Sequence, residues 1–176
     1  METMSITREM NIPEKEIQIR LKLLQTITIP KVYCNSETWT NLTKWEMEKI
    51  DSIVSGSLKK LIGLPRTTPT LGIYAETGIA PARHHIAQKK LMLLHRIKSG
   101  EPQKLINKIY EEQKEMDLPK CWYQEIKTIK QIYKLDVISD NELGAMSKAK
   151  WKNIAKKAIQ NELQNELENA SEEIRN

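Results

Sequence analysis

The sequence predicts an all-α fold, an irregular multi-helix array that ends in a long C-terminal helix. Its 176 residues include six glycines and no phenylalanine, whereas Lys, Glu, Ile, Leu and Gln, a set that favours helix over sheet, are abundant. Apolar residues recur at intervals of three and four, which is the spacing of one face of a helix. Proline, glycine and capping residues interrupt this pattern at points where helices begin and end.

In the first part of the chain, capping residues predict two helices. Pro13 and the apolar residues Ile17, Leu21 and Leu24 predict an amphipathic helix that ends before Pro30. Thr43 and Glu46 have the spacing of a capping box, in which each side chain satisfies a backbone amide at the start of the next helix. Gly63 ends that helix. Its predicted apolar stripe consists of Met47, Ile50, Val54, Leu58 and Leu61.

The middle of the chain contains two further predicted helices. Thr68, just before Pro69, starts a short helix that Gly78 closes. Pro81 opens the longest of the middle helices, which ends at Gly100. Its apolar face is predicted to consist of Ile86, Leu93 and Ile97, with Ala87, Leu91 and Leu94 beside them.

The second half of the chain has less regular spacing. A helix is expected from Pro102 to about residue 113, and another from Pro119 to about residue 133. Ser139 marks a turn or a new helix start, and Ser147 is predicted to cap the last long helix. The residues expected to face inward on the first of these helices are Leu105, Ile106 and Ile109.

Several classes of protein are disfavoured by the sequence. No apolar run approaches the ~20 residues that a membrane helix needs, and the polar start differs from a secretory signal, so an intracellular protein, in nucleus or cytoplasm, is expected. Cys34 and Cys121 lie far apart, which favours reduced thiols over a disulfide or zinc site. His84 and His95 are three helical turns apart, too far to share a metal, so we assign no metal site and expect no cofactor.

The positive charge is concentrated in the middle third of the chain. Residues 59–110 hold ten Lys and Arg against two Asp and Glu, a net charge of +8, whereas the flanking parts are slightly negative. Such a concentration favours a polyanion, whose contacts weaken as the salt concentration rises. The alternative is a solvated helical face that is merely basic. The candidate nucleic-acid-binding residues are Lys59, Lys60, Arg66, Arg83, Lys89, Lys90, Arg96 and Lys98.

The candidate cations on the predicted helix after Pro81 form a broad band. Residues 83, 90 and 98 fall near one side of a helix, and residues 89 and 96 fall near another. A band of this kind suits a phosphate backbone, which presents charge and shape instead of sequence. A second, weaker patch surrounds Trp151, whose ring can stack on a base but is better explained as the apolar anchor of an amphipathic helix. The lysines of this patch are Lys148, Lys150, Lys152, Lys156 and Lys157.

Two short phrases, residues 34–40 (CNSETWT) and 61–70 (LIGLPRTTPT), are unusually distinctive. With residues 76–81 and 90–97, they resemble the region just downstream of the polymerase palm in non-LTR retrotransposon reverse transcriptases. The order and spacing agree with the family, but Cys34 and Asn35 stand where the family tends to have tyrosine and glycine. The resemblance implies a thumb that grips the template–primer duplex. The residues that it marks as structural are Glu37, Trp39, Gly63, Pro65, Pro69 and Gly78.

The residues themselves favour structural roles within the first phrase. Glu37 has no partner acid, base or metal ligand in the sequence pattern, so we expect it to cap a neighbouring backbone turn. Trp39 is expected to fill the angle between two helices.

The catalytic centre of such a polymerase has no counterpart in this sequence. Reverse transcription needs aspartates that hold two metal ions, and the family supplies an adjacent pair of them from the palm. No two aspartates are neighbours in this chain, so we expect no enzymatic activity. The resemblance then implies a thumb-like helical domain at residues 1–118 and a C-terminal helical extension at residues 119–176.

Two functions remain open from the sequence. The first is a non-catalytic fragment or remnant of a reverse transcriptase that binds an RNA, RNA–DNA or DNA duplex through its basic middle segment. The alternative is a helical protein-interaction module, or a relic without function, whose exposed apolar face meets a protein partner or a second copy.

Overall fold

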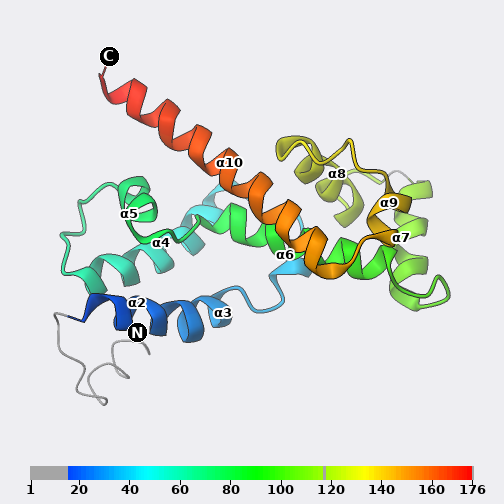
Figure 1. The fold of residues 1–176 in the computed structure, drawn as a ribbon, viewed down its shortest axis with the longest axis horizontal. Coiled ribbons are helices and arrows are strands. Elements are labelled where there is room, and N and C mark those ends of the chain that lie inside the picture. Colours follow the sequence, from blue (N-terminus) through cyan, green and yellow to red (C-terminus); the bar gives the residue numbers. More distant parts are fainter. Residues whose placement is uncertain (1–15, 117, 176) are drawn as a thin grey trace. The chain divides into compact units, whose positions relative to one another are not determined.

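The fold is all-α, as the sequence predicts. The structure is a computed structural model that describes residues 16–116 and 118–175, and every regular element in these ranges is a helix (Figure 1). The chain forms two compact units: unit 1 contains Met1–Cys34 and Thr43–Ala82, and unit 2 contains Asn35–Leu42 and Arg83–Asn176. The predicted boundary between residues 118 and 119 therefore lies inside unit 2. No helix in the described ranges is long and apolar enough to cross a membrane.

The first helix of unit 1 continues through a proline. Helix α2 (Ile17–Leu23) passes into a π-helical turn, η1 (Leu24–Thr28), and then into α3 (Ile29–Val32) without a break. The predicted end before Pro30 is therefore wrong. A proline ring inside a regular helix meets the carbonyl four residues earlier, and the wider π-helical turn just before Pro30 relaxes this contact. Pro13, the predicted start, lies outside the described residues.

The capping residues of α4 (Lys44–Ile62) act as predicted. The Glu46 amide donates to Thr43 Oγ1 at 3.2 Å, and the Thr43 amide donates to Glu46 Oε2 at 2.7 Å. Gly63 ends the helix with a φ of 77°, in the left-handed region that glycine adopts without strain. The predicted stripe turns inward: Val54, Leu58 and Leu61 are buried, and Met47 and Ile50 are partly buried.

Asp51 ties the remaining parts of unit 1 to α4. Helix α5 (Thr70–Thr77) follows Pro69 and ends at Gly78, which has a φ of 64°. Tyr74 on α5 donates its hydroxyl hydrogen to Asp51 Oδ1 at 2.9 Å. The Ala82 amide donates to the same oxygen at 2.7 Å. One carboxylate of α4 thus fixes both α5 and the end of unit 1.

Unit 2 contains the remaining helices. They are η2 (Ser36–Thr38), α6 (Ala82–Lys98), α7 (Leu105–Met116), α8 (Trp122–Ile132), α9 (Asp140–Ala145) and α10 (Lys148–Arg175). Of these, α6 starts at the last residue of unit 1. Ser139 and Glu142 form a second capping box, which confirms a helix start at Ser139. Ser147 accepts a hydrogen bond from the Lys150 amide at 3.3 Å and so caps α10, the predicted long C-terminal helix.

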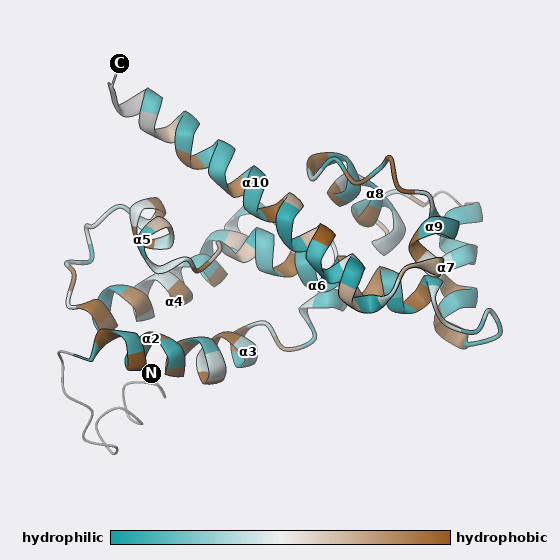
Figure 2. Cartoon of the chain, viewed as in Figure 1, coloured by the Kyte–Doolittle hydropathy of each residue, from teal (hydrophilic) through white to brown (hydrophobic). Residues whose placement is uncertain are grey.

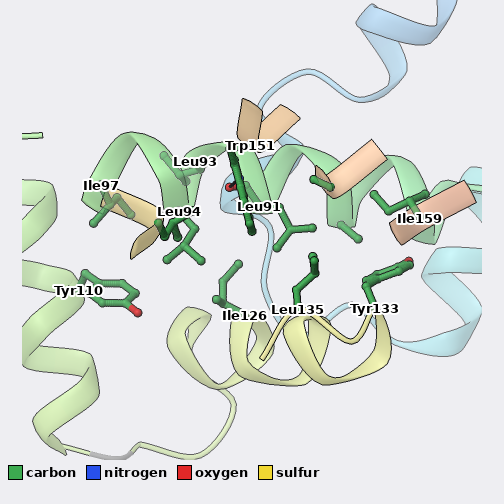
Figure 3. Packing of buried hydrophobic residues seen from close by; sticks show 13 residues of the cluster. Leu91, Leu93, Leu94, Ile97, Tyr110, Ile126, Tyr133, Leu135, Trp151 and Ile159 are labelled. Atoms are coloured by element: carbon green, nitrogen blue, oxygen red, sulfur yellow. Dashed lines mark hydrogen bonds between the residues drawn. The ribbon is translucent and has the colours of Figure 1, made fainter. Parts of the chain in front are cut away.

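Trp151 lies at the centre of the unit 2 core (Figure 3). Its side chain is fully buried, and its indole N–H donates to the Leu91 carbonyl at 2.9 Å. Leu94 from α6 and Ile126 from α8 are buried in the same cluster. These contacts confirm that Trp151 is the apolar anchor of α10, because a ring in this position cannot stack on a base.

Helix α7 faces the core with a side that differs from the predicted one. Leu105, Ile106 and Ile109, which were expected inside, are 73%, 38% and 43% exposed. The buried residues are Asn107 and Tyr110 instead. The Tyr110 ring packs edge-on against aromatic rings of α8, with a centroid distance of 5.5 Å to the nearer one. This aromatic contact sets the rotation of α7 and leaves its aliphatic side chains outside.

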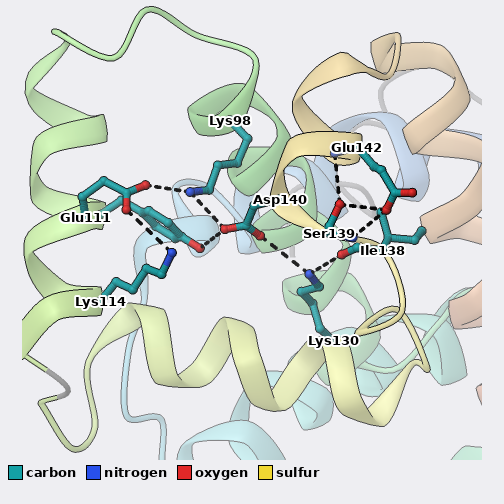
Figure 4. Close-up of polar contacts among 9 residues, drawn as sticks. Lys98, Glu111, Lys114, Lys130, Ile138, Ser139, Asp140 and Glu142 are labelled. Carbon is teal, nitrogen blue, oxygen red and sulfur yellow. Dashed lines mark hydrogen bonds and ion pairs between the residues drawn. The ribbon is translucent and has the colours of Figure 1, made fainter.

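A polar network joins α6, α7, α8 and α9 (Figure 4). Lys98 Nζ lies 2.7 Å from Glu111 Oε1 and 3.0 Å from Asp140 Oδ2. The same ammonium lies 4.0 Å from the centroid of the Tyr110 ring, a cation–π contact. Lys130 Nζ lies 3.8 Å from Asp140 Oδ1. Asp140 is therefore the junction of the network, since it contacts cations from two helices.

We expect the stability of the protein to fall in acid partly through Asp140. Burial raises the pKa of this carboxyl, but the hydrogen bond and charge of Lys98 and the charge of Lys130 outweigh burial and hold the pKa below its ordinary value. A lowered folded-state pKa stabilises the fold above the ordinary pKa, and this contribution disappears as the pH falls through the folded-state value. Urea denaturation between about pH 6 and about pH 2 should therefore show a flatter acid limb for Asp140→Asn. Equal slopes for both proteins would contradict this role.

Candidate nucleic-acid interface

The cations of α6 divide between two sides of the helix, and on one side all three are paired with carboxylates of unit 2, although Arg83 itself is 54% exposed. Arg83 pairs with Glu166, and Lys90 pairs with Glu125. Lys90 is only 4% exposed. Lys98, on the same side, belongs to the polar network. These three predicted binding residues thus have carboxylate partners in unit 2, and Lys90 is the one of them whose charge is buried.

The other side of α6 lines a groove with the start of α10. The groove encloses a cavity of about 530 Å³ and lies entirely within unit 2. Lys89 and Arg96 from α6 line it together with Lys148 and Lys152 from α10. We call this feature the basic groove. Its other lining residues are Glu37, His85, Gln88, Met92, Leu93, His95 and Ser99.

The position of Trp151 explains how the lysines of α10 reach the groove. Trp151 and Ala155 point into the core, so Lys148 and Lys152, one turn apart on an adjacent side of the helix, are held next to α6. The sequence placed these two lysines in a separate, weaker patch. The i, i+4 spacing of the two lysines around a tryptophan is the sequence signal that they share one face of the helix. The position of that face next to Arg96 results from tertiary packing and has no sequence signal.

Positive charge dominates the lining of the basic groove. Four Lys and Arg side chains line it, and Glu37 is its one carboxylate among the described residues. Glu37 Oε2 lies 3.7 Å from Lys89 Nζ, so part of the charge of Lys89 is compensated. Arg96, Lys148 and Lys152 are exposed, which keeps their charges accessible from solvent. The groove can therefore attract an anion through its positive electrostatic potential and bind it through direct hydrogen bonds.

The first family-like phrase lies against α8 and forms one wall of unit 2. The Glu37 carbonyl accepts a hydrogen bond from the Trp122 indole at 2.7 Å. The side chain of Glu37 faces Lys89, a contact that differs from the predicted capping role. Trp39 is half-buried. Asn35 has a φ of 54°, a left-handed conformation that asparagine tolerates better than most residues.

The remaining predicted cations lie in unit 1, around the second family-like phrase. Lys59 Nζ donates to the Arg66 carbonyl at 2.9 Å and so holds the turn after Gly63. The Pro65 carbonyl accepts from the Thr68 amide at 3.1 Å, which closes the same turn. Lys60 and Arg66 are exposed. Lys59 therefore has a structural role here, whereas Lys60 and Arg66 present charge on the surface of unit 1.

The histidines next to these cations are held by other contacts. His84 is buried, with Nε2 3.0 Å from Glu166 Oε2 and Nδ1 2.9 Å from the Tyr133 hydroxyl. Burial lowers the pKa of His84, and this effect outweighs the opposing hydrogen bond and charge of Glu166. His95 Nε2 lies 2.9 Å from the Met146 carbonyl oxygen. Within residues 16–116 and 118–175, no group of His, Cys, Asp and Glu has the arrangement of a metal site, and Cys34 and Cys121 are free thiols.

Comparison with known proteins adds no further guide to the role of this site. No protein-family model, curated protein or solved structure matches the chain. The chemistry of the basic groove is therefore the main ground for a functional proposal. Its lysine and arginine side chains can hydrogen-bond to phosphate oxygens. Four such cations line the groove and, among the described residues, only one carboxylate does, so the groove keeps a net positive charge.

Proposed function

We propose that the chain binds the phosphate backbone of a nucleic-acid duplex through the basic groove, as a thumb-like, non-catalytic part or remnant of a non-LTR retrotransposon reverse transcriptase. The observation that carries the proposal is the convergence of Arg96, Lys148 and Lys152, from two helices far apart in sequence, on one groove. Each of these side chains can contact a phosphate oxygen. RNA–DNA hybrid, RNA and DNA duplexes all present such a backbone.

Binding of this kind depends on charge and shape, not on base identity. Phosphate contacts fix the position of a protein on a duplex. They also release counterions from the nucleic acid, and because added salt opposes this release, the affinity falls as the salt concentration rises. The basic groove has few apolar rings for stacking, because Trp151 is buried in the core. A duplex backbone is therefore a better match for it than the splayed bases of a single strand.

The backbone of the family-like segments supports the retroelement origin in this proposal. Gly63 in the second phrase and Gly78 in residues 76–81 both adopt left-handed conformations, with φ values of 77° and 64°. Asn35 adopts a left-handed conformation at the position where the family tends to have glycine. The departure from the family at this residue thus preserves the backbone geometry, since asparagine is among the few other residues that adopt it readily.

We expect the purified chain to bind a labelled RNA–DNA hybrid with an affinity that falls steeply as salt rises. Reversing three groove charges with Arg96→Glu, Lys148→Glu and Lys152→Glu should weaken binding by about tenfold or more at low salt. It should also reduce the slope of log affinity against log salt by about 0.9 for each phosphate that the variant no longer neutralises. Fluorescence anisotropy across a salt series measures both quantities.

A second variant with the same change in net charge separates the groove from general electrostatics. Lys44, Lys127 and Lys157 are exposed and lie outside the groove lining, so replacing all three by Glu should leave most of the binding intact. Equal losses in the two variants would assign the binding to net charge alone. An absence of binding at low salt, from a chain whose circular dichroism shows it to be folded, would overturn the proposal.

The exposed side of α7 favours a second candidate function, that of a helical protein-interaction module. Leu105, Ile109 and Met116 are all more than 40% exposed on one helix. An apolar surface of this kind associates through a contact that salt barely weakens, unlike phosphate binding. The same salt series therefore distinguishes the two functions.

A further inference from the structure

Helix α7 carries an apolar stripe on its outer side. Leu105, Ile109 and Met116 lie within one sector of the helix and are 73%, 43% and 57% exposed. Ile106 lies at the edge of this sector and is 38% exposed. In Figure 2 the α7 ribbon carries brown, hydrophobic positions between hydrophilic ones. We call Leu105, Ile106, Ile109 and Met116 the α7 stripe.

The α7 stripe continues into a hollow of unit 2. A cavity of about 360 Å³ lies beside α7, and Ile106 and Ile109 belong to both the stripe and the cavity lining. Leu93, Tyr110 and Trp122 add further apolar surface to the hollow. A partner that covers the stripe can therefore also place a side chain in this hollow. Such an insertion adds shape complementarity to the buried apolar area.

The charges beside the α7 stripe have opposite signs at the two ends of the helix. Lys104 and Lys108 flank its first half, and Glu112 and Glu115 flank its second half. All four side chains are exposed. At 100° per residue Lys108, Glu112 and Glu115 fall on the same side of the stripe, and Lys104 directly precedes the first residue of the helix. The flank is thus basic at one end and acidic at the other.

We propose that the α7 stripe is a self-association surface, on which α7 of a second copy of this chain packs antiparallel about a two-fold axis. In that arrangement Lys108 lies opposite the partner's Glu112, and Lys104 lies opposite the partner's Glu115. Each contact occurs twice because a two-fold interface uses the same surface on both copies. In a parallel two-fold arrangement the charged flanks of the two copies lie on opposite sides of the helix pair, so these charges would not meet. This inference goes beyond nucleic-acid binding and does not depend on it, because the basic groove is lined by other residues.

The dimer is expected to be weak. Helix α7 has 12 residues, so the contact between two copies lies at the small end of specific protein interfaces. For a contact of this size we expect a dissociation constant of about 10 µM or weaker. Sedimentation velocity of the full chain without nucleic acid, up to about 500 µM, covers this range.

Removing the apolar anchors should dissociate the dimer. Leu105→Ser with Ile109→Ser is expected to raise the dissociation constant by about tenfold or more, because a few central apolar side chains carry most of the affinity of an interface. Both residues are exposed, so the fold should be retained. Ile132→Ser with Val137→Ser is the matched control, since these residues are 50% and 80% exposed elsewhere in unit 2. The control should leave association unchanged.

Charge reversal tests the antiparallel register. Lys108→Glu alone gives each chain Glu at both 108 and 112, and Glu112→Lys alone gives each chain Lys at both positions. Each variant by itself should therefore be monomeric. A mixture of the two should form a heterodimer at least as tight as the original homodimer, because every facing pair then has opposite signs. A change in α7 stability alone cannot produce this recovery.

Three results would overturn the proposal. A chain that remains monomeric over the whole concentration range has no such interface. Dimers that survive the stripe variant, or that are lost in the control, associate through another surface. A mixture of the two charge variants that stays monomeric would exclude the antiparallel pairing of Lys108 with the partner's Glu112.

Discussion

Replacing Trp151 by alanine is expected to reduce the free energy of unfolding by about 3–5 kcal/mol. The side chain is fully buried among residues of several helices, so its removal leaves a large cavity in unit 2. The indole hydrogen bond to the Leu91 carbonyl disappears as well. Since small domains are stable by only about 5–15 kcal/mol, this change should shift the midpoint of urea denaturation strongly. Far-UV circular dichroism follows the transition without relying on tryptophan emission.

Two other variants show which part of the tryptophan matters. Trp151→Phe keeps most of the apolar volume and loses the indole hydrogen bond, so an intermediate loss of about 1–2 kcal/mol is expected. Trp45→Ala is the exposed control, because Trp45 is 65% exposed, and it should change stability by no more than about 0.5 kcal/mol. Similar losses for Trp151→Ala and Trp45→Ala would show that Trp151 does not anchor the core.

Glu125→Ala is expected to be the second strongly destabilising change, with a loss of about 3–5 kcal/mol. The substitution leaves the buried ammonium of Lys90 without its carboxylate partner. It also removes the acceptor of the Asn41 amide, which holds residues 35–42 against α8. Urea denaturation at neutral pH measures the loss.

Removing both charges should restore much of this stability. Lys90→Met with Glu125→Leu replaces the ion pair by apolar side chains, and such replacements are often neutral or stabilising. Glu48→Ala is the surface control, since Glu48 and Lys44 form an ion pair whose side chains are 64% and 92% exposed. It should cost at most about 0.5 kcal/mol. If Glu125→Ala costs no more than Glu48→Ala, the burial of Lys90 is unimportant.

Helix starts and ends were the part of the fold that the sequence predicted best. The capping box at Thr43 and the helix ends at Gly63 and Gly78 form as expected, and a helix starts at Ser139, one of the two outcomes predicted there. These features depend on residues within one turn of each other, so neighbouring sequence is sufficient to predict them. Pro30 is an exception, because a π-helical turn before it has no clear sequence signal. The starts expected at Thr68, Pro102 and Pro119 were also two or three residues early, since these helices begin at Thr70, Leu105 and Trp122.

The inward side of a helix was harder to predict. Leu105 and Ile109 form a regular apolar stripe on α7, yet Tyr110 is the residue that faces the core. Periodicity in the sequence shows that a helix has an apolar side and a polar side. Which residues are buried depends on the side chains that the neighbouring helices place against it. Here the aromatic rings of α8 attract Tyr110.

The candidate site was predictable only in part for the same reason. Spacing on α6 separated residues 83, 90 and 98 from residues 89 and 96, and the structure retains this division. The sequence could not show that the first group is paired inside unit 2, because partners such as Glu125 lie 35 residues away from the lysine they bind. It also could not join Arg96 to Lys148 and Lys152, which meet only after α10 packs on α6.

The interleaved course of the chain has a consequence for how the protein is made. Residues 35–42 belong to unit 2, but residues 43–82 of unit 1 follow them before unit 2 resumes. Asn41 is held by Glu125, 84 residues further along the chain. During synthesis residues 35–42 leave the ribosome well before Glu125 has been added to the chain. Unit 2 therefore closes late in translation, and neither unit can be excised from the gene as one uninterrupted piece.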